Sequence, residues 1–215
     1  MIELSLIQKI AIWVIPVILA ITVHEVAHGW VASKFGDQTA RLAGRLTLNP
    51  ISHIDVMGTL VIPMLLLAFS NFIFGWAKPV PVDARNMRNP RWNMVFVAAA
   101  GPLANLIMAL GWAGIAKLGL HSNAWFGVPL IGMGQAGMMI NIILAVLNCL
   151  PIPPLDGGQM LSNLLPPRIG WQLDQLQPYG LLILILLMFT GVLSFIMWPI
   201  VSFLFNGIAM LFGLG

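Results

Sequence analysis

The sequence predicts an all-α membrane protein, a polytopic helical bundle with about five to six apolar segments. Of its 215 residues 59% are hydrophobic and only 8% are charged, whereas a soluble domain has about 25% charged residues. The charges are also clustered, because Glu25 is the only charged residue between Lys9 and Lys34. This composition excludes disordered, collagen-like and disulfide-rich secreted proteins.

Long uncharged runs define the expected membrane segments. A bilayer core needs about 20 apolar residues per helix. Expected segments cover residues 6–33, 57–75, 92–116, 128–150 and 179–214. The last run is long enough for two helices, with Gly191 and Pro199 as expected breaks. We expect one integral-membrane domain, residues 1–215, with a core at 6–160 and C-terminal apolar segments at 179–214.

The first apolar segment contains the motif His24-Glu25-Val26-Ala27-His28, which has the form H-E-x-x-H. On a helix, positions i and i+4 share one face, so both imidazoles can bind the same metal ion. Glu25 beside them can take a proton from a metal-bound water. Ionisable side chains inside a membrane segment are costly, so the motif predicts a metal site.

A catalytic zinc site usually has a third protein ligand. Asp156 is the best candidate, because it ends a long uncharged run in the Pro-rich string NCLPIPPLDGG, residues 148–158. The prolines stop a helix and the glycines allow close backbone approach. From spacing alone, a carboxylate that caps a helix is an equally good interpretation. His53 and His121 are weaker candidates, and His53 with Asp55 more readily shapes the loop after the motif.

Three motifs in order carry a family resemblance: HEVAH, then Gly101-Pro102-Leu103-Ala104-Asn105, then NCLPIPPLDGG. From about residue 20 to 160, the chain resembles the site-2 protease family, the intramembrane zinc metalloproteases of peptidase family M50. It is most similar to the compact bacterial or archaeal form, which also carries stretches such as GRLTLNP and WAKPVPV. We expect no PDZ or CBS domain within these residues.

The resemblance implies a complete catalytic site. One Zn²⁺ is held by His24, His28 and Asp156, and Glu25 acts as general base on a zinc-activated water. The substrates are membrane proteins, cleaved in or near their transmembrane segments. Asn105 and Asn148 are implied near the site, where their amides bind the substrate backbone or stabilise the oxyanion. A helix-interface hydrogen bond is the alternative for each asparagine.

The stretch Lys78-Pro79-Val80-Pro81-Val82 cannot be helical and prefers an extended conformation. We therefore expect short extended or β loops near the active site. One interpretation is an edge to which an unwound substrate adds as a strand. The other is a plain loop.

The order of the motifs also predicts topology. GPLAN and LDGG bracket two spans and so share a face, and HEVAH lies near loop 34–56. The site assembles at one depth only if segment 57–75 re-enters instead of crossing. That arrangement puts eight of the ten Lys and Arg residues on one face, whereas a crossing gives six and four. By the positive-inside rule, the active site is nearer the cytoplasmic face. The family resemblance implies that the membrane is a prokaryotic cell membrane.

Two other functions are alternative interpretations of this cluster. A polytopic metal or proton transporter could use the same His, Glu and Asp cluster, but the inverted repeats typical of transporters are missing from the sequence. A catalytically dead scaffold conflicts with the intact motif. The expected partners are the lipid bilayer and a membrane-protein or transmembrane-peptide substrate, with no nucleic acid. The sequence does not predict an oligomeric state.

Overall fold

The computed structural model describes residues 5–62, 64–65, 75–122 and 126–214. Within these residues the chain forms helices, helical turns and loops, with no β-strand, which confirms the all-α prediction. The helices are α1 (Leu6–Lys34), α2 (Thr39–Leu42), α4 (Pro90–Leu120), α5 (Gly127–Asn148), α6 (Asp156–Leu164), α7 (Pro167–Asp174), α8 (Gly180–Phe189) and α9 (Val192–Phe212), and the turns are η1 (Pro50–His53), η2 (Val56–Val61), η3 (Ala84–Asn86) and η4 (Gln177–Tyr179).

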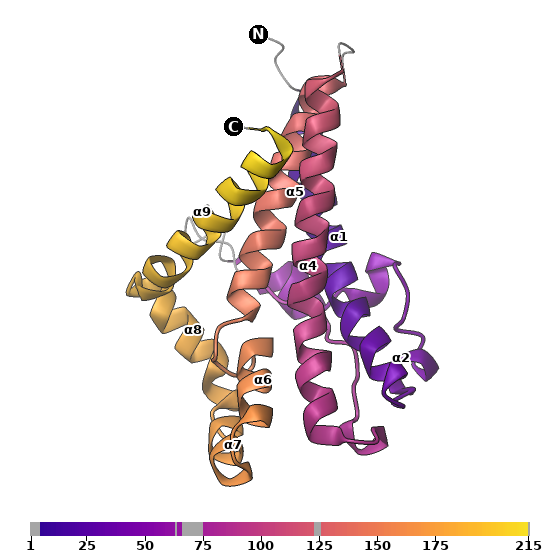
Figure 1. Cartoon of the computed structure of the whole chain (residues 1–215), viewed down its shortest axis with the longest axis vertical. Coiled ribbons are helices and arrows are strands. Elements are labelled where there is room, and N and C mark those ends of the chain that lie inside the picture. Colours follow the sequence, from indigo (N-terminus) through magenta and orange to yellow (C-terminus); the bar gives the residue numbers. More distant parts are fainter. Residues whose placement is uncertain (1–4, 63, 66–74, 123–125, 215) are drawn as a thin grey trace.

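Helices α4 and α5 form the centre of the bundle, and α1 and α9 pack on them (Figure 1). Small residues bring α4 and α5 close together, as is common where membrane helices meet. A Cβ atom added at Gly134 of α5 would lie 2.5 Å from the backbone nitrogen of Ala116 on α4. Around this contact, Trp112, Met138 and Ile142 are buried in one apolar cluster.

The chain is a multi-pass membrane protein. Five helical stretches within the described residues are long and apolar enough to cross a bilayer. Their outer surfaces expose large apolar side chains, such as Phe195 and Phe203 on α9, which suits lipid and not water. The five stretches are Ile10–Lys34, Pro90–Leu120, Gly127–Asn148, Pro167–Phe189 and Val192–Phe212.

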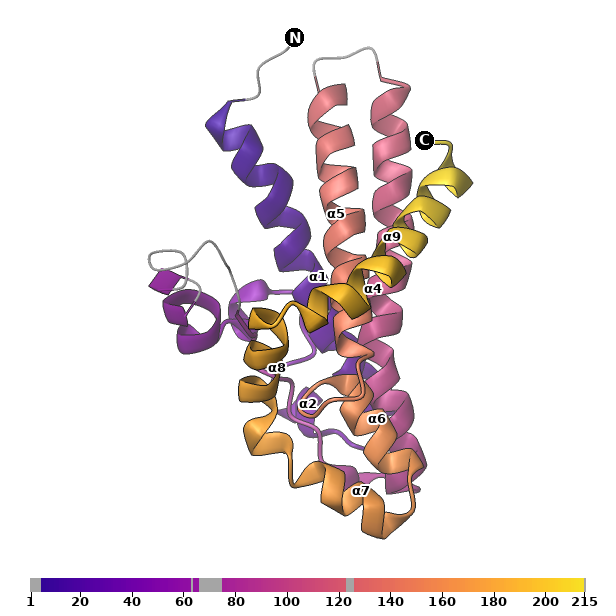
Figure 2. The ribbon, with the colours of Figure 1, turned by 90° about the vertical axis from the view of Figure 1, so that its left-hand side faces the viewer.

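The short helices α2, α6 and α7 lie at one end of the bundle. In Figure 2, α2, α6 and α7 lie at the end where α4 begins, while the N-terminus lies at the opposite end. Arg91 near the start of α4 donates from Nε to the carbonyl of Asn163 on α6, at 2.7 Å. The start of α4, which carries GPLAN, is therefore joined to α6, which begins at Asp156.

The two ends of segment 57–75 are hydrogen-bonded to each other. The backbone N–H of Trp76 donates to the carbonyl of Gly58 at 3.0 Å, and the Thr59 hydroxyl donates to the carbonyl of Trp76 at 2.9 Å. Residues 63 and 66–74 lie outside the described residues. The described ends of the segment therefore lie side by side, as the re-entrant interpretation requires.

The C-terminal third differs from the sequence-based expectations in two places. Gly191, with a φ of 76°, separates α8 from α9 as expected, but the break expected at Pro199 is wrong because Pro199 lies inside α9. Proline is tolerated in membrane helices when neighbouring groups replace the lost bond. Residues 151–178 lie between the expected apolar segments 128–150 and 179–214, and they contain two short helices that hydropathy does not predict, α6 and α7.

Candidate metal centre

His24 and His28 stand one turn apart on α1 and face the same space. Their ring centroids are 4.6 Å apart with the rings edge to face, and their Nε2 atoms are 3.1 Å apart. The side chains of His24 and His28 are 10% and 12% exposed, so most of the surface of each imidazole is covered by protein. The i, i+4 spacing of the motif thus places both imidazoles where one ion could be bound.

Asp156 completes a group of three. It is the first residue of α6, and its Oδ2 atom lies 3.3 Å from Nε2 of His24 and 3.4 Å from Nε2 of His28. The N-cap of α6 is Leu155, and this cap has no side-chain hydrogen bond. Asp156 therefore does not cap its helix, which was the other interpretation that the sequence left open.

The hydrogen atoms of both imidazoles point away from this group. Nδ1 of His28 lies 2.7 Å from the carbonyl oxygen of Val97, and Nδ1 of His24 lies 2.6 Å from Oδ1 of Asn105. Because carbonyl oxygens only accept hydrogen bonds, each Nδ1 carries a hydrogen, and in the neutral form of each imidazole Nε2 then carries a lone pair. The buried Oδ2 of Asp156 has no hydrogen-bond donor. Three acceptor atoms thus converge, and a cation among them would relieve their mutual repulsion.

The spacing of these atoms fits a metal ion. Zinc bonds of about 2.0–2.1 Å in a tetrahedron place neighbouring ligand atoms about 3.3 Å apart. The three distances in this group are 3.1, 3.3 and 3.4 Å. Two imidazoles with one carboxylate are also a ligand set of catalytic zinc sites, in which water takes the fourth position. These residues could therefore hold one zinc ion.

Glu25 lies next to this group and is held by an extended loop. Its Oε2 atom accepts a hydrogen bond from the backbone N–H of Val80, at 2.8 Å. The same loop is fixed elsewhere: the Lys78 N–H donates to the carbonyl of His53, and Arg45 donates to the carbonyl of Lys78. These bonds occupy backbone groups that a substrate strand would need, so they favour the plain-loop interpretation for this part of the stretch.

Comparison with known proteins decides the family. The family model described as Peptidase family M50 matches residues 12–123 and 111–191. The chain belongs to peptidase family M50. The match covers the segments that carry His24, His28 and Asp156.

Curated relatives of this M50 protein have consistent names. It is 39% identical over 193 residues to "Putative zinc metalloprotease YwhC" of Bacillus subtilis, with 88% of this chain and 85% of that protein covered. It is 30% identical to proteins named "Putative zinc metalloprotease Rip2" of Mycolicibacterium smegmatis and Mycobacterium tuberculosis, with 88% of this chain and 71% of each covered. No solved structure matches it.

The two predicted asparagines of this M50 protein lie in different surroundings. Asn105 is fully buried, and besides its contact with His24 it donates from Nδ2 to Ala20 O at 3.2 Å and to Oδ1 of Asn141 at 2.9 Å. Asn148 is half-buried and donates to Leu144 O of its own helix. The structure thus brings Asn105 to the three-residue group and gives Asn148 no hydrogen bond to that group.

The parts played by three residues are not predicted from the sequence: Val97 and Gly101 contact the imidazoles, and Asn141 contacts Asn105, the partner of His24. Asn141 carried a detectable signal, since a polar amide inside an apolar segment needs a partner. Val97 takes part only through its backbone carbonyl, which no side-chain pattern records. Gly101 belongs to the GPLAN motif, but its sequence position does not show that its α-carbon faces the imidazoles.

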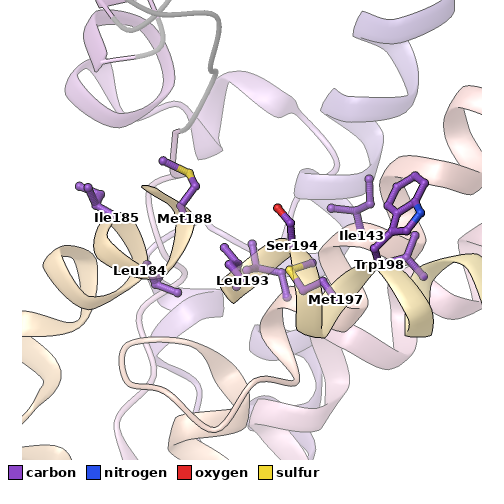
Figure 3. Close-up of a pocket in the computed structure, with 10 residues that line it drawn as sticks. Ile143, Leu184, Ile185, Met188, Leu193, Ser194, Met197 and Trp198 are labelled. Atoms are coloured by element: carbon purple, nitrogen blue, oxygen red, sulfur yellow. The ribbon is translucent and has the colours of Figure 1, made fainter. Parts of the chain in front are cut away.

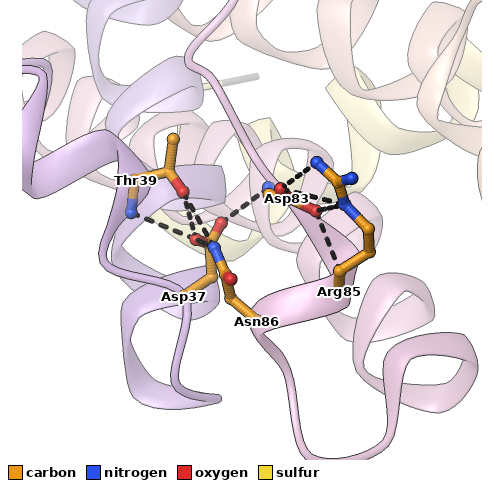
Figure 4. Close-up of polar contacts among 5 residues, drawn as sticks. All are labelled: Asp37, Thr39, Asp83, Arg85 and Asn86. Carbon is orange, nitrogen blue, oxygen red and sulfur yellow. Dashed lines mark hydrogen bonds and ion pairs between the residues drawn. The ribbon is translucent and has the colours of Figure 1, made fainter.

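A polar cluster around Asp37 ties the end of α1 to the loop that carries Val80 (Figure 4). The carboxylate of Asp37 is fully buried. It accepts hydrogen bonds from Thr39, from the Asn86 side chain and from the Asp83 backbone N–H. Burial alone would raise the pKa of Asp37, but these donors outweigh it and lower the pKa below its usual value of 3.8.

An apolar pocket of about 290 Å³ lies apart from the site residues, among α5, α8 and α9 (Figure 3). None of the predicted site residues lines it. Its walls are almost wholly hydrocarbon, so it suits an apolar group and not peptide hydrolysis. The lining residues are Ile143, Leu147, Leu184, Ile185, Met188, Leu193, Ser194, Met197, Trp198 and Val201.

Proposed function

We propose that this chain is an intramembrane zinc endopeptidase that cleaves peptide bonds in or near the transmembrane segments of membrane proteins. One observation carries the proposal: His24, His28 and Asp156 direct three acceptor atoms at one point, with Glu25 adjacent. The two histidines lie on a membrane-spanning helix. Membership of peptidase family M50 supports the same chemistry.

Each residue of the group has a distinct proposed role. His24, His28 and Asp156 hold one Zn²⁺. When bound, zinc acts as a Lewis acid that lowers the pKa of water and polarises the substrate carbonyl. Glu25 accepts the proton of the attacking water and delivers it to the leaving amine. The Val80 N–H holds the Glu25 carboxylate in place through Oε2, so that less conformational freedom is lost during the reaction.

Intramembrane substrates explain the position of the site. A helix in lipid has all its peptide groups paired, so its cleavage requires local unwinding and water. The proposed site lies toward the end of the bundle where the polar loops gather (Figure 2). Most Lys and Arg residues of the sequence belong to these loops, so we place the opening of the site on the cytoplasmic side.

The contacts of the asparagines divide their proposed roles. Asn105 has both amide groups engaged inside the protein, which favours positioning of His24 over contact with the substrate. Asn148 uses its NH₂ group on Leu144 O. It stays the candidate that orients the substrate backbone or the oxyanion.

Glu25→Gln tests the proposal directly. The variant should keep zinc, because Glu25 is not among the three converging residues, and should lose cleavage of a co-expressed membrane substrate. Asp174→Asn is the matched control, since it removes an exposed carboxylate on α7 and should cleave as the unmodified protein does. Cleavage by Glu25→Gln at an unchanged rate would refute the general-base role.

The transporter alternative makes the opposite prediction in the same experiment. The purified protein is reconstituted into sealed vesicles and zinc is added to the outer solution. Zinc entry into the vesicles and cleavage of the substrate are then measured in the same preparation. We expect cleavage without flux. Flux that depends on His24 and Asp156, in the absence of any cleavage, would favour the transporter instead.

A further inference from the structure

We propose that Asn141 on α5 is a positioning residue that fixes the tautomer of His24, acting through Asn105 on α4. The three side chains come from three different helices and form one hydrogen-bonded chain: His24 to Asn105 at 2.6 Å and Asn105 to Asn141 at 2.9 Å. Both asparagines are fully buried. Water therefore cannot substitute for either amide, and the direction of each hydrogen bond is set within the protein.

The orientation of the Asn141 amide sets the direction of the hydrogen bonds in this chain. Its side-chain NH₂ group lies 2.8 Å from the carbonyl oxygen of Gly137, one turn earlier on α5. A backbone carbonyl only accepts, so the NH₂ group and not the oxygen must face Gly137. The amide oxygen of Asn141 is thereby turned toward α4, where only a donor can meet it.

Asn105 keeps the same direction of hydrogen bonding, from the NH₂ group of one amide to the oxygen of the next. Its NH₂ group supplies that donor to Asn141 and places its second hydrogen on the carbonyl of Ala20 on α1, at 3.2 Å. Both hydrogens of the amide are then used, and the oxygen of Asn105 is left facing His24. A flipped Asn105 would set oxygen against two acceptors, which a buried site does not tolerate.

The oxygen of Asn105 leaves His24 one choice. Nδ1 must carry the hydrogen that it donates, so the lone pair is on Nε2, the atom that faces His28 and Asp156. His28 reaches the same tautomer by another route, because its Nδ1 donates directly to the Val97 carbonyl. One histidine is thus fixed by backbone and the other by a chain of two amides anchored on Gly137.

The role in metal binding rests on the proposed zinc site, but the tautomer can be measured without zinc. In zinc-free protein with ¹⁵N-labelled histidine in detergent micelles, ring ¹⁵N shifts distinguish the two tautomers, and single His→Gln substitutions assign the signals. We expect His24 in one form, with hydrogen on Nδ1. A mixture, or hydrogen on Nε2, in the unmodified protein would overturn the inference whatever the protein cleaves.

Asn141→Leu removes the anchor with little change in volume. We expect His24 to lose its single tautomer and the Kd for zinc to rise about tenfold or more, as for other residues behind metal ligands. Asn141→Asp should restore both properties, because a protonated carboxyl group has the same donor and acceptor arrangement. Should Asn141→Leu fail to fold, Asn141→Ala removes the same amide with a smaller side chain, and the same tautomer measurement decides the question.

Ile142→Ala is the matched control, because Ile142 is the neighbouring fully buried residue of α5 and has no part in the amide chain. It should lower the unfolding temperature while leaving the His24 tautomer unchanged. Equal loss of the tautomer in both variants would show a packing effect and overturn the inference, as would an unchanged tautomer in Asn141→Leu. If the tautomer is as expected but no variant binds zinc, the proposed function fails and the positioning role of Asn141 on His24 stands.

Discussion

Gly101 of α4 lies directly against the imidazole of His24: a Cβ atom at position 101 would stand 2.5 Å from the His24 Cε1 atom. It would also overlap Nε2 of His28. Residues of α4 also bind both imidazoles, since Asn105 accepts from Nδ1 of His24 and the Val97 carbonyl accepts from Nδ1 of His28. The imidazoles therefore cannot move away from α4 without losing these hydrogen bonds. The absence of a side chain at position 101 is therefore a condition for the three acceptor atoms to converge.

Gly101→Ala should displace the imidazoles and weaken zinc binding, by about tenfold or more. Gly111→Ala is the matched control on the same helix, because nothing lies within 4 Å of a Cβ atom placed there. Zinc titration of both purified variants checks the prediction. Normal zinc affinity in Gly101→Ala would show that α4 can move away, contrary to the packing described.

Replacement of Asp37 should loosen the connection between α1 and the loop that carries Val80. In Asp37→Asn, the new NH₂ group would face one of the donors that the carboxylate accepts from. We expect the free energy of unfolding to fall by about 2 kcal/mol. Thermal unfolding in detergent measures the change. Arg85→Ala removes only an exposed ion pair with Asp83 and should leave the unfolding temperature nearly unchanged.

The contribution of Asp37 should also depend on pH. Its folded-state pKa lies below the unfolded value of 3.8, so the ionised carboxylate stabilises the fold above that pH. This stabilisation is lost as the pH falls from the unfolded value through the folded-state pKa. The stability difference between the unmodified protein and Asp37→Asn should therefore shrink at acid pH. A difference that stayed constant would contradict the cluster in Figure 4.

Val80→Pro removes the N–H that binds Glu25 without adding charge. We expect kcat to fall about tenfold, since the carboxylate loses its fixed position, while zinc content stays the same. Val80→Ala keeps the N–H and separates this effect from loss of the buried side chain. Steady-state cleavage of a transmembrane peptide gives kcat for each variant. Equal kcat values in the two variants would show that the hydrogen bond is not needed.

Single cysteines can test the side on which the loops lie. In a Cys149→Ala background, Leu42→Cys and Arg85→Cys place thiols at exposed positions in the two polar loops, and Leu120→Cys places one at the far end of α4. The first two should react from the cytoplasmic side and the third from the other. Labelling of Leu42→Cys and Arg85→Cys from opposite sides would show that segment 57–75 crosses the membrane.

Much of the fold could be predicted because a bilayer leaves few solutions. Uncharged runs predicted α1, α4 and α5 to within a few residues, and Gly191 marked the boundary of α9. Helices α6 and α7 were missed because they are short and mixed in polarity, so neither hydropathy nor length distinguishes them from loop. Pro199 misled because a membrane helix can continue through a proline when packing replaces the lost hydrogen bond.

The candidate site was predictable where side-chain chemistry follows from spacing. HEVAH places two imidazoles on one helix face. The long uncharged run before Asp156 made it the best candidate for the third ligand, and the family resemblance implied the same residue. What spacing could not predict is how each imidazole is held, since that depends on a backbone carbonyl at Val97 and on an amide at Asn141, 36 residues from its partner Asn105. Such contacts arise only when three helices have packed.

The length of α4 limits how far water must travel. Its 31 residues span about 46 Å, against about 30 Å for the hydrocarbon core. Gly101 lies eleven residues from Pro90, about 16 Å along the helix axis. If α4 is upright and centred in the bilayer, the imidazoles lie only about 8 Å inside the hydrocarbon boundary. A few solvent molecules in single file would then hydrate the reaction, without a long aqueous channel.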